Sequence, residues 1–261
     1  MWNGHKKDYG FLYRHLIFEG EYLNDERNGK GKEYYEGRLK FEGEYLNGYK
    51  NGRGKEYNYD KILIYDGEYI NGDKTGQGKE YDNKGTLVYE GEFIKGRKSG
   101  QGKEYDNSGN LTFEGEFKEG IKWNGKLKIY DYAGNLEYEG QYSEGQKNGY
   151  GKGIERDCSG KKEFKGEYYK GKEWNGYIKE YNDRGKLIFE GEYSQGAKNG
   201  NGKEYNGYGN IIFEGKYRDG EKNGIGKEYD ERGKLIYEGE YLNGKVYIEA
   251  LEENLNKYSD L

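Results

Sequence analysis

Paired carboxylates are the residues of this sequence that could most directly perform acid–base chemistry. Glu42 and Glu44 flank Gly43, and Glu90 and Glu92 repeat the arrangement farther along the chain. On a strand, the two carboxylates of a pair would lie on one face about 7 Å apart, a separation that superficially suits acid–base work on a sugar. Because such pairs recur with lysines around them, we interpret them as a solvated cross-strand charge ladder.

Two other patterns also point to chemistry only superficially. Gly76-Gln77-Gly78-Lys79 resembles a phosphate-binding loop, but it lacks the Walker spacing and a following helix. His5, His15 and Cys158 are the only histidines and cysteine, too few for a dedicated zinc site or an intrachain disulfide. No histidine lies near Cys158 in sequence to act as its base. We therefore expect no enzymatic activity, no cofactor and no bound metal.

Composition and charge restrict the class of protein further. The chain has 261 residues with 32 Tyr, 47 Gly and no Pro, a composition that disordered tails and linkers do not have, so it should fold. Lys and Arg number 44, Asp and Glu 49, and the net charge is -5. The two signs alternate along the chain, which disfavours nucleic acid as a partner. Without an apolar signal core at the N-terminus, we expect a cytoplasmic protein.

A period of about 24 residues organises the whole chain. A five-residue unit, aromatic-x-Gly-x-aromatic, recurs along it, and a second unit such as Asn51-Gly52-Arg53-Gly54-Lys55-Glu56-Tyr57 lies between most copies. Tandem self-similarity of this kind is the signature of a repeat protein, and we see no domain boundary within it. The ten copies of the first unit begin at Phe18, Phe41, Tyr65, Tyr89, Phe113, Tyr138, Phe164, Phe189, Phe213 and Tyr237.

Within one repeat, apolar and polar residues alternate with a period of two. The segment from Leu39 to Tyr45 has this pattern, which predicts a half-buried strand, and the second unit predicts a shorter strand that ends at Tyr57. Asp82-Asn83-Lys84-Gly85 has the composition of a turn. That turn is expected to join the two strands of a hairpin. The linker from residue 47 to 52, which we expect to lead back to the next hairpin, is too short for a parallel crossover. Each repeat is therefore predicted to be a β-hairpin in an antiparallel meander.

The glycine at the centre of the aromatic unit needs a packing explanation, because glycine inside a strand costs about 0.5–1 kcal/mol relative to alanine. We expect an aromatic ring of a neighbouring strand to lie across its bare Cα. Rings over glycines would then replace a second packing layer. A single-layer sheet would leave part of the aromatic face open, as an elongated groove.

These motifs resemble the MORN repeat family. The string from Phe41 to Gly54 reads aromatic-x-Gly-x-aromatic-x-x-Gly-x-x-x-Gly-x-Gly, like the family's motif, and copies of it cover residues 18–244. The Gly-Lys-Glu-Tyr spacing resembles a microbial and protist variant of the family. The resemblance implies an elongated sheet of β-hairpins that acts as a scaffold, dimerisation or protein-binding element. In eukaryotes it implies a place at cytoskeletal, ciliary or membrane-associated structures.

Departures from the repeat indicate where a partner would bind. Repeats five and seven carry one extra residue, which we place in the segments 121–125 and 172–176, and Leu127 and Ile178 then replace the later glycine. Each segment contains Trp-Asn-Gly, as does Trp2-Asn3-Gly4. The indole either fills volume in an altered turn or forms a binding hot spot. The candidate partner-binding residues are Trp123, Trp174, Tyr69, Phe93, Phe117, Tyr142 and Tyr168.

The predicted architecture is all-β, an elongated single-layer antiparallel meander of about ten stacked MORN hairpins with a short C-terminal capping helix. Residues 1–17 are predicted to form a degenerate half-repeat that caps the N-terminal end, and residues 18–244 the repeat array. Residues 245–261 are predicted to be helical. Ile248, Leu251, Leu255 and Tyr258 would share one stripe of that helix.

The sequence favours a non-enzymatic scaffold that holds a peptide, a helix or a partner protein and whose end strands could pair into a homodimer. A cytoskeletal or ciliary assembly is a candidate location. One alternative is an adaptor associated with membrane lipid, which the lack of a polybasic cluster disfavours. Another is an antitoxin-like or immunity-like neutralising partner in a microbe.

Overall fold

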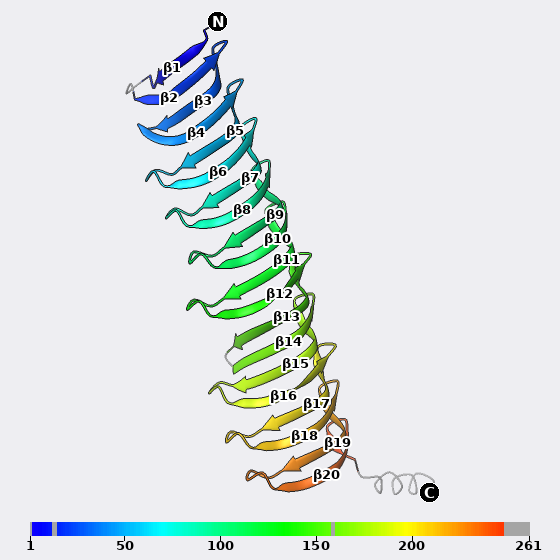
Figure 1. The fold of residues 1–261 in the computed structure, drawn as a ribbon. Helices are drawn as coiled ribbons and strands as arrows, with labels where there is room; N and C mark the ends of the chain where they lie inside the picture. Colours follow the sequence, from blue (N-terminus) through cyan, green and yellow to red (C-terminus); the bar gives the residue numbers. More distant parts are fainter. Residues whose placement is uncertain (1, 12–14, 158–159, 248–261) are drawn as a thin grey trace. The chain divides into compact units, whose positions relative to one another are not determined.

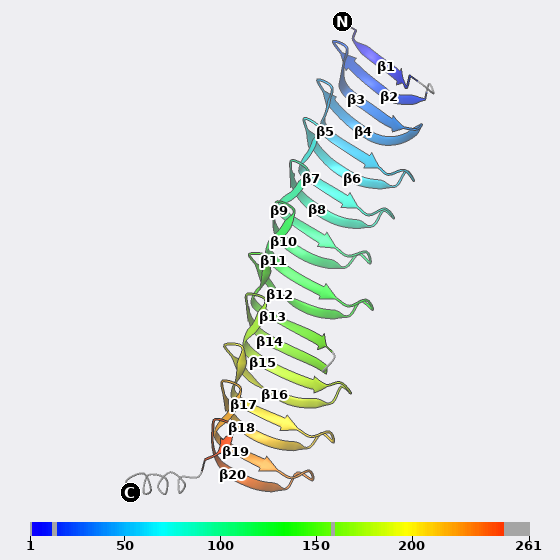
Figure 2. The same cartoon turned by 180° about the vertical axis from the view of Figure 1, so that it is seen from behind.

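The fold was analysed in a computed structural model, which describes residues 2–11, 15–157 and 160–247. All regular structure in these residues is β-strand, as Figure 1 shows and as Figure 2 shows from behind. The contacts divide the chain into two compact units, unit 1 (Met1–Lys128 with Tyr142–Gly145) and unit 2 (Ile129–Gln141 with Gln146–Leu261). Inspection of the sequence indicated no such boundary.

Consecutive strands pair antiparallel within each unit, which confirms the predicted all-β meander of hairpins. The strands of unit 1 are β1 (Gly4–Tyr9), β2 (Leu16–Leu23), β3 (Glu26–Tyr35), β4 (Arg38–Leu46), β5 (Tyr49–Tyr57), β6 (Leu63–Ile70), β7 (Asp73–Tyr81), β8 (Leu87–Ile94), β9 (Arg97–Tyr105) and β10 (Leu111–Lys118). Two strands have residues in both units, β11 (Ile121–Tyr130) and β12 (Leu136–Ser143). The strands of unit 2 are β13 (Gln146–Asp157), β14 (Gly160–Tyr169), β15 (Lys172–Asn182), β16 (Leu187–Ser194), β17 (Ala197–Tyr205), β18 (Ile211–Arg218), β19 (Glu221–Tyr229), β20 (Leu235–Leu242) and β21 (Lys245–Val246).

Two kinds of turn alternate along the chain. Short turns such as Asn47-Gly48 join the strands of one hairpin, and their two residues have φ angles of 49° and 84°, as a two-residue type I′ turn requires. Longer turns join one hairpin to the next. There the Asp82 side chain accepts hydrogen bonds from the Lys84 and Thr86 N–H groups, at 2.8 Å each, which confirms the predicted turn chemistry.

The short turn changes one boundary that the sequence suggested. Because two residues suffice for the turn, the rest of the predicted linker lies inside β5. That strand has nine residues, as many as β4, so the prediction of a shorter second strand is wrong. The turns also tie each hairpin to the one before it, since the N–H of Gly72 donates to the carbonyl of Lys50 and that of Gly96 to the carbonyl of Lys74, at 2.9 Å each.

Glycines lie opposite each other where the two strands of a hairpin approach most closely. Gly43 pairs with Gly54, and a Cβ on Gly43 would lie 2.6 Å from the carbonyl oxygen of Arg53 and 2.7 Å from Cζ of Phe41. A Cβ on Gly54 would meet the same ring. The predicted ring-over-glycine packing is therefore present. For Gly43, however, the ring belongs to the same strand, and the backbone of the neighbouring strand is the harder obstacle.

The core of each unit is a row of aromatic rings on one face of the strands. Phe41 packs edge-to-face on Tyr45 of its own strand and on Tyr69 of the next hairpin, with ring centroids 5.6 and 5.3 Å apart. In unit 2, Phe213 and Tyr241 repeat the contact at 5.4 Å. Each such pair contributes about 0.5–1.5 kcal/mol beyond the area it buries. The row therefore supplies the packing that a second layer would otherwise give.

The structure describes most of the predicted N-terminal half-repeat but only the first residues of the predicted C-terminal helix. The segment from residue 4 to 9 forms β1, which pairs with β2. At the other end, Lys245–Val246 pairs with β20 as the short strand β21, so the predicted helix does not begin at residue 245. The remainder of that helix, with its proposed apolar stripe, lies outside the described residues. No helix long and apolar enough to cross a membrane occurs in the part of the chain that the structure describes.

Candidate functional site

The paired carboxylates have separate structural partners. In unit 1, Glu42 forms an ion pair with Lys32 at 3.5 Å and accepts a hydrogen bond from the Tyr57 hydroxyl at 2.6 Å. The Tyr57 hydroxyl is the main reason that the pKa of Glu42 is lowered, since burial opposes it. Glu44 instead accepts a hydrogen bond from the backbone N–H of Arg53 at 3.3 Å. The expected cross-strand charge ladder therefore involves the first carboxylate of the pair, and the second supports the backbone of the next strand.

The other motifs that suggested chemistry are also part of the architecture. Lys79 lies within β7 and forms an ion pair with Glu90 at 3.1 Å, so the Gly-x-Gly-Lys string is a strand and not a phosphate loop. His15 accepts a hydrogen bond from the N–H of Gly10 through its backbone carbonyl, at 2.8 Å. Among the described residues, no group of three or more His, Cys, Asp or Glu side chains could hold a metal ion. Cys158 lies outside the described residues.

A row of alternating cations and carboxylates covers the aromatic row of unit 1, and we call it the inner charge row. The Nζ atom of Lys50 lies 4.0 Å from the centroid of the Phe41 ring and 3.1 Å from Oε1 of Glu56. Lys74 continues the row, because its Nζ atom lies 3.6 Å from a carboxylate oxygen of Glu56 and 3.6 Å from one of Glu80. The members of the row are Glu33, Lys50, Glu56, Lys74, Glu80, Lys98, Glu104 and Lys122.

The aromatic face is consequently closed where the sequence suggested an open groove. Four of the predicted binding residues, Tyr69, Phe93, Phe117 and Tyr168, are at most 2% exposed. Edge-to-face ring packing covers them, together with the inner charge row in unit 1. These four candidate partner-binding side chains are therefore buried in the structure. Of the remaining candidates, Tyr142 is half-buried and donates a hydrogen bond to the carbonyl of Gly145 at 2.6 Å.

The tryptophans mark a change in how two strands are paired. Trp174 is the one unpaired residue of a bulge in β15, between Glu173 and Asn175, whereas β5 has three unpaired residues at the equivalent place. The bulge is thus shorter than in a regular hairpin. The extra length lies beyond it, since β15 has eleven residues and β5 nine, which corrects the placement of the inserted residue. Trp123 is the bulge residue of β11 in the same way.

The Asn of Trp-Asn-Gly explains why the three residues occur together. Asn175 donates a side-chain hydrogen bond to Glu167 at 2.9 Å and accepts one from the N–H of Gln195 at 3.0 Å. The motif thus connects the preceding strand to the next short turn. Both Trp123 and Trp174 remain half-buried, so part of each indole stays available to a partner.

The buried aliphatic residues of these repeats, Ile178 and Leu127, occupy register positions that glycine and glutamate hold in a regular hairpin. Ile178 lies opposite Gly191 on one side, where a regular hairpin has glycine, as predicted. On its other side it lies opposite Phe164, where a regular hairpin has a glutamate of the inner charge row. Leu127 likewise lies opposite Phe113. An apolar side chain thus replaces the inner carboxylate in repeats five and seven.

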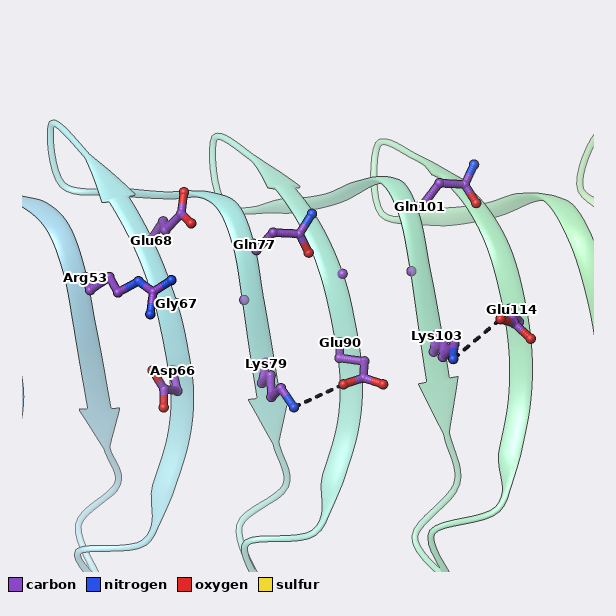
Figure 3. A pocket seen from close by; sticks show the side chains of 13 residues that line it. Arg53, Asp66, Gly67, Glu68, Gln77, Lys79, Glu90, Gln101, Lys103 and Glu114 are labelled. Carbon is purple, nitrogen blue, oxygen red and sulfur yellow. Dashed lines mark ion pairs between the residues drawn. The ribbon is translucent and has the colours of Figure 1, made fainter.

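Hollows lie on the opposite face of the strands in the part of the chain that the structure describes. In unit 1, a hollow of about 520 Å³ extends from Arg53 to Glu114 over glycines that include Gly67, Gly78 and Gly91 (Figure 3). A second, of about 700 Å³, extends from His5 to Asp66. Because both hollows share Arg53 and Asp66, they form one continuous surface, which we call the glycine-floored groove.

Unit 2 has its own glycine-floored groove. A hollow of about 380 Å³ lies over Gly191, Gly202 and Gly215 and is lined by Tyr177 and Ile225. Another hollow, of about 480 Å³, extends from Leu136 to Lys179 and also includes Tyr177, but its lining contains Tyr138, Phe164 and one glycine, Gly153, in place of the paired glycines. The missing side chains of the paired glycines thus lower the floor on this face, while the aromatic rings fill the other.

One residue per repeat varies on this otherwise uniform surface. It lies opposite the residue before the second aromatic of the next unit, usually a carboxylate, as Arg53 does opposite Glu68, although Asn201 lies opposite Lys216. We call it the variable position. This position was not among the residues predicted from the sequence. Aligning the second units column by column would have shown that it varies while the residues on either side of it stay nearly constant. The variable position holds Lys30, Arg53, Gln77 and Gln101 in unit 1 and Tyr150, Tyr177, Asn201 and Ile225 in unit 2.

Consecutive antiparallel hairpins with a buried aromatic row and a glycine-floored groove define a β-hairpin repeat protein. Comparison with family models narrows this class. The model described as MORN repeat matches seven segments that together make up more than half of the chain, so the chain belongs to the MORN repeat family. The matched segments are residues 18–37, 41–61, 65–87, 89–111, 138–152, 189–209 and 213–234. The unmatched repeats include both that carry a tryptophan bulge, those beginning at Phe113 and Phe164.

Comparison with individual proteins adds little. No curated protein matches the chain. Sixty-eight chains of solved structures match it, one of them in the crystal structure of TcdB2-TccC3-TEV, at 12% sequence identity and a TM-score of 0.26. That match covers 93% of this chain and 14% of the other chain. A likeness this weak supports no conclusion about fold or function.

Proposed function

We propose that this chain is a non-enzymatic protein-binding scaffold and that its partner lies along the glycine-floored groove. The observation that carries the proposal is the variable position, where a residue of changing chemistry lines a hollow in a surface that is otherwise repeated. A scaffold recognises a partner through such differences, because identical repeats cannot fix its register.

Exposure supports the choice of this face over the aromatic one. In unit 2, Tyr150, Tyr177 and Ile225 are 53%, 43% and 67% exposed. Tyrosine is enriched at protein interfaces, where a rigid ring buries area at low entropic cost. An enzymatic role has less support, because Glu42 and Glu44 each hold a structural hydrogen bond within the sheet.

Affinity measurement on a partner captured with the intact protein tests the proposal. Tyr177→Ala and Ile225→Ala should each weaken binding measured by isothermal titration, by roughly tenfold for a hot-spot side chain. Trp123→Ala and Trp174→Ala test the half-buried indoles in the same assay. Tyr208→Ala, which changes an exposed turn residue of unit 2, is the matched control. Full affinity in all of the groove and tryptophan variants would overturn the proposal.

A further inference from the structure

Repeat seven reverses a charge that eight of the other nine repeats keep, the exception being the last repeat, which has Val246 at this place. In regular hairpins, the residue opposite the second aromatic is a cation, as Lys50 is opposite Tyr45 and Lys198 opposite Tyr193. In repeat seven, Glu173 lies opposite Tyr168 at this register position. The cations at the equivalent place are Arg27, Lys50, Lys74, Lys98, Lys122, Lys147, Lys198 and Lys222.

The usual cation has a well-defined place in the fold. Its charged group lies above the ring of the first aromatic of the hairpin, for example 3.7 Å from the Phe189 centroid for Lys198 and 4.0 Å from the Phe213 centroid for Lys222. The Lys198 ammonium also forms an ion pair with Glu180 at 2.9 Å. The aromatic row thus presents a ring face and a carboxylate to each cation, two groups that attract an ammonium together.

Repeat seven keeps the ring and has a carboxylate but lacks the cation. Within residues 2–11, 15–157 and 160–247, no cationic group lies over the Phe164 ring, and Glu173 has neither an ion pair nor a hydrogen bond. Its Oε1 atom is buried without a partner, although part of the residue stays exposed. An unpaired carboxylate in such surroundings is costly.

A second polar group beside it is also without a partner. The Tyr168 hydroxyl is buried and makes no hydrogen bond. The equivalent Tyr217 donates at 2.9 Å to Glu204, which lies opposite Phe213, but the residue in the position of that glutamate is here Gly153, opposite Phe164. The hydroxyls of Tyr45, Tyr69 and Tyr241 in regular hairpins are likewise without a hydrogen bond, so the feature peculiar to repeat seven is the unpaired carboxylate of Glu173.

We propose that Glu173, which is partly exposed beside the buried Phe164 ring, forms an ion pair with a lysine side chain of the partner protein, which supplies the positive charge that this repeat lacks. Charge complementarity and the other cations of the chain identify the occupant. The inference rests on the proposed function, in that a bound protein must deliver the side chain. It adds a contact on the aromatic face, at one repeat, to the glycine-floored groove.

The nearest cations of the chain do not fill the site. Lys162 replaces the leucine found two residues before the first aromatic in most repeats, and its charge acts on the Tyr193 hydroxyl together with that of Glu173. Lys147 lies over the Tyr138 ring at 4.3 Å and reaches Glu155 at 4.0 Å. Neither forms an ion pair with Glu173 within the described residues.

The test uses the full chain and a small probe in place of the partner. Nα-acetyl-lysine methylamide is titrated while the ring signals of Phe164 and Tyr168 are followed by NMR, with the uncharged norleucine analogue as the matched probe. The lysine probe should shift both signals, and the norleucine probe should not. Glu173→Gln should weaken the shift about tenfold or more, the effect of losing one charge-assisted contact, while Glu221→Gln, at an exposed position of unit 2, should leave it unchanged.

Three outcomes would overturn the site. The first is an equal response to both probes, and the second is unchanged binding in Glu173→Gln. The third is binding of the lysine probe only after Lys162→Leu, because Lys162 would then be the partner of Glu173. The result is separable from the proposed function. A captured partner whose affinity falls in the groove variants but not in Glu173→Gln removes this site alone, whereas indifference to the groove variants removes the scaffold proposal.

Discussion

The two units use the same hairpin but differ in how continuously their charges are paired. In unit 1, the inner charge row extends from Glu33 in β3 to Lys122 in β11, across five consecutive hairpins. Each of Lys50, Lys74 and Lys98 lies between two glutamates. In unit 2, the row is interrupted by Gly153 in repeat six and by Glu173 and Ile178 in repeat seven. The glycine-floored groove differs in the same sense, with charged or amide side chains at its variable positions in unit 1 and mainly tyrosine or isoleucine in unit 2.

This difference separates the requirements of folding from those of recognition. The paired glycines and the aromatic row occur in both units, so they are what a hairpin needs in order to stack. The charges and the variable positions change without loss of the hairpin, so they are free to specify a partner. Four perturbations test this division, beginning with the features that the units share.

Filling the glycine floor should have the largest effect, and an equal one in both units. Gly43→Val and Gly191→Val each place side-chain atoms against the backbone of the paired strand, since even a Cβ would lie 2.6 and 2.7 Å from the Arg53 and Asn201 carbonyl oxygens. We expect a loss of about 3 kcal/mol or more of unfolding free energy, the upper part of the range for overpacking. Urea unfolding measures it. Gly207→Ala, which has open space around its Cβ, is the control, and a loss confined to one unit would contradict the shared role.

Removing one cation should distinguish the units. Lys74→Met leaves Glu56 and Glu80 each with one lysine fewer, and we expect a loss of about 1–2 kcal/mol, below the cost of breaking a fully buried pair because these groups are partly exposed. Lys198→Met removes a single ion pair, with Glu180, and should cost about 0.5–1 kcal/mol. Hydrogen exchange of the flanking strands in each unit provides the measurement. Equal losses would show that continuity of the row adds nothing.

Acidification should destabilise unit 1 through its inner charge row. Burial opposes ionisation of Glu56, but Lys50 and Lys74 outweigh it and lower its pKa below the ordinary value of 4.5. For Glu104, Lys122 and Lys98 likewise outweigh burial. A carboxyl group with a lowered pKa in the folded state stabilises the fold above its unfolded pKa, and this contribution is lost as pH falls through the folded pKa.

The corresponding measurement is hydrogen exchange of β5 to β9 across the range from pH 7 to below about 4.5. Protection of these strands should fall at the acid end, and the fall should be smaller in a Glu56→Gln, Glu104→Gln double variant. A double variant with the same acid profile as the unchanged protein would exclude these two carboxylates as its cause.

Exchanging residues at the variable position should have the smallest effect on stability. Gln77→Tyr and Tyr177→Gln swap the chemistry of the two grooves at exposed sites, so we expect changes within about 0.5 kcal/mol. Thermal unfolding of both variants tests this expectation. A substantially larger loss would mean that the variable position is constrained by folding, and the proposed recognition role would then lose its main support.

Local rules made most of the fold predictable from sequence. Alternation around Phe41 and Tyr45 gives a strand, and Asp82 followed by Gly85 gives a turn, because each depends on neighbours a few residues away. The ring-over-glycine packing followed from Gly43 for the same reason. The prediction was wrong only about which strand carries the ring over Gly43. The path of the backbone opposite Gly43 is not determined by residues close to it in sequence.

The candidate site depended on contacts between hairpins and was therefore less predictable. Burial of Tyr69 results from Phe41 and Lys50, which lie 28 and 19 residues earlier in the chain and reach it only after the hairpins have paired. The bulge at Trp174 depends on the register of β14 against β15, and a one-residue change in register alters every pairing beyond it. Composition could indicate that the tryptophans were unusual, but not which strand residue they displaced.

The bond from each short turn to the hairpin before it has a mechanical consequence. Because the N–H of Gly72 reaches the carbonyl of Lys50 and no farther back along the chain, tension on one end of a unit is carried by one such connection and one strand pair at a time. Pulling on that end should therefore release the unit in a ladder of small, nearly equal extensions of about 24 residues each, roughly 80 Å of contour length, with no single high-force rupture.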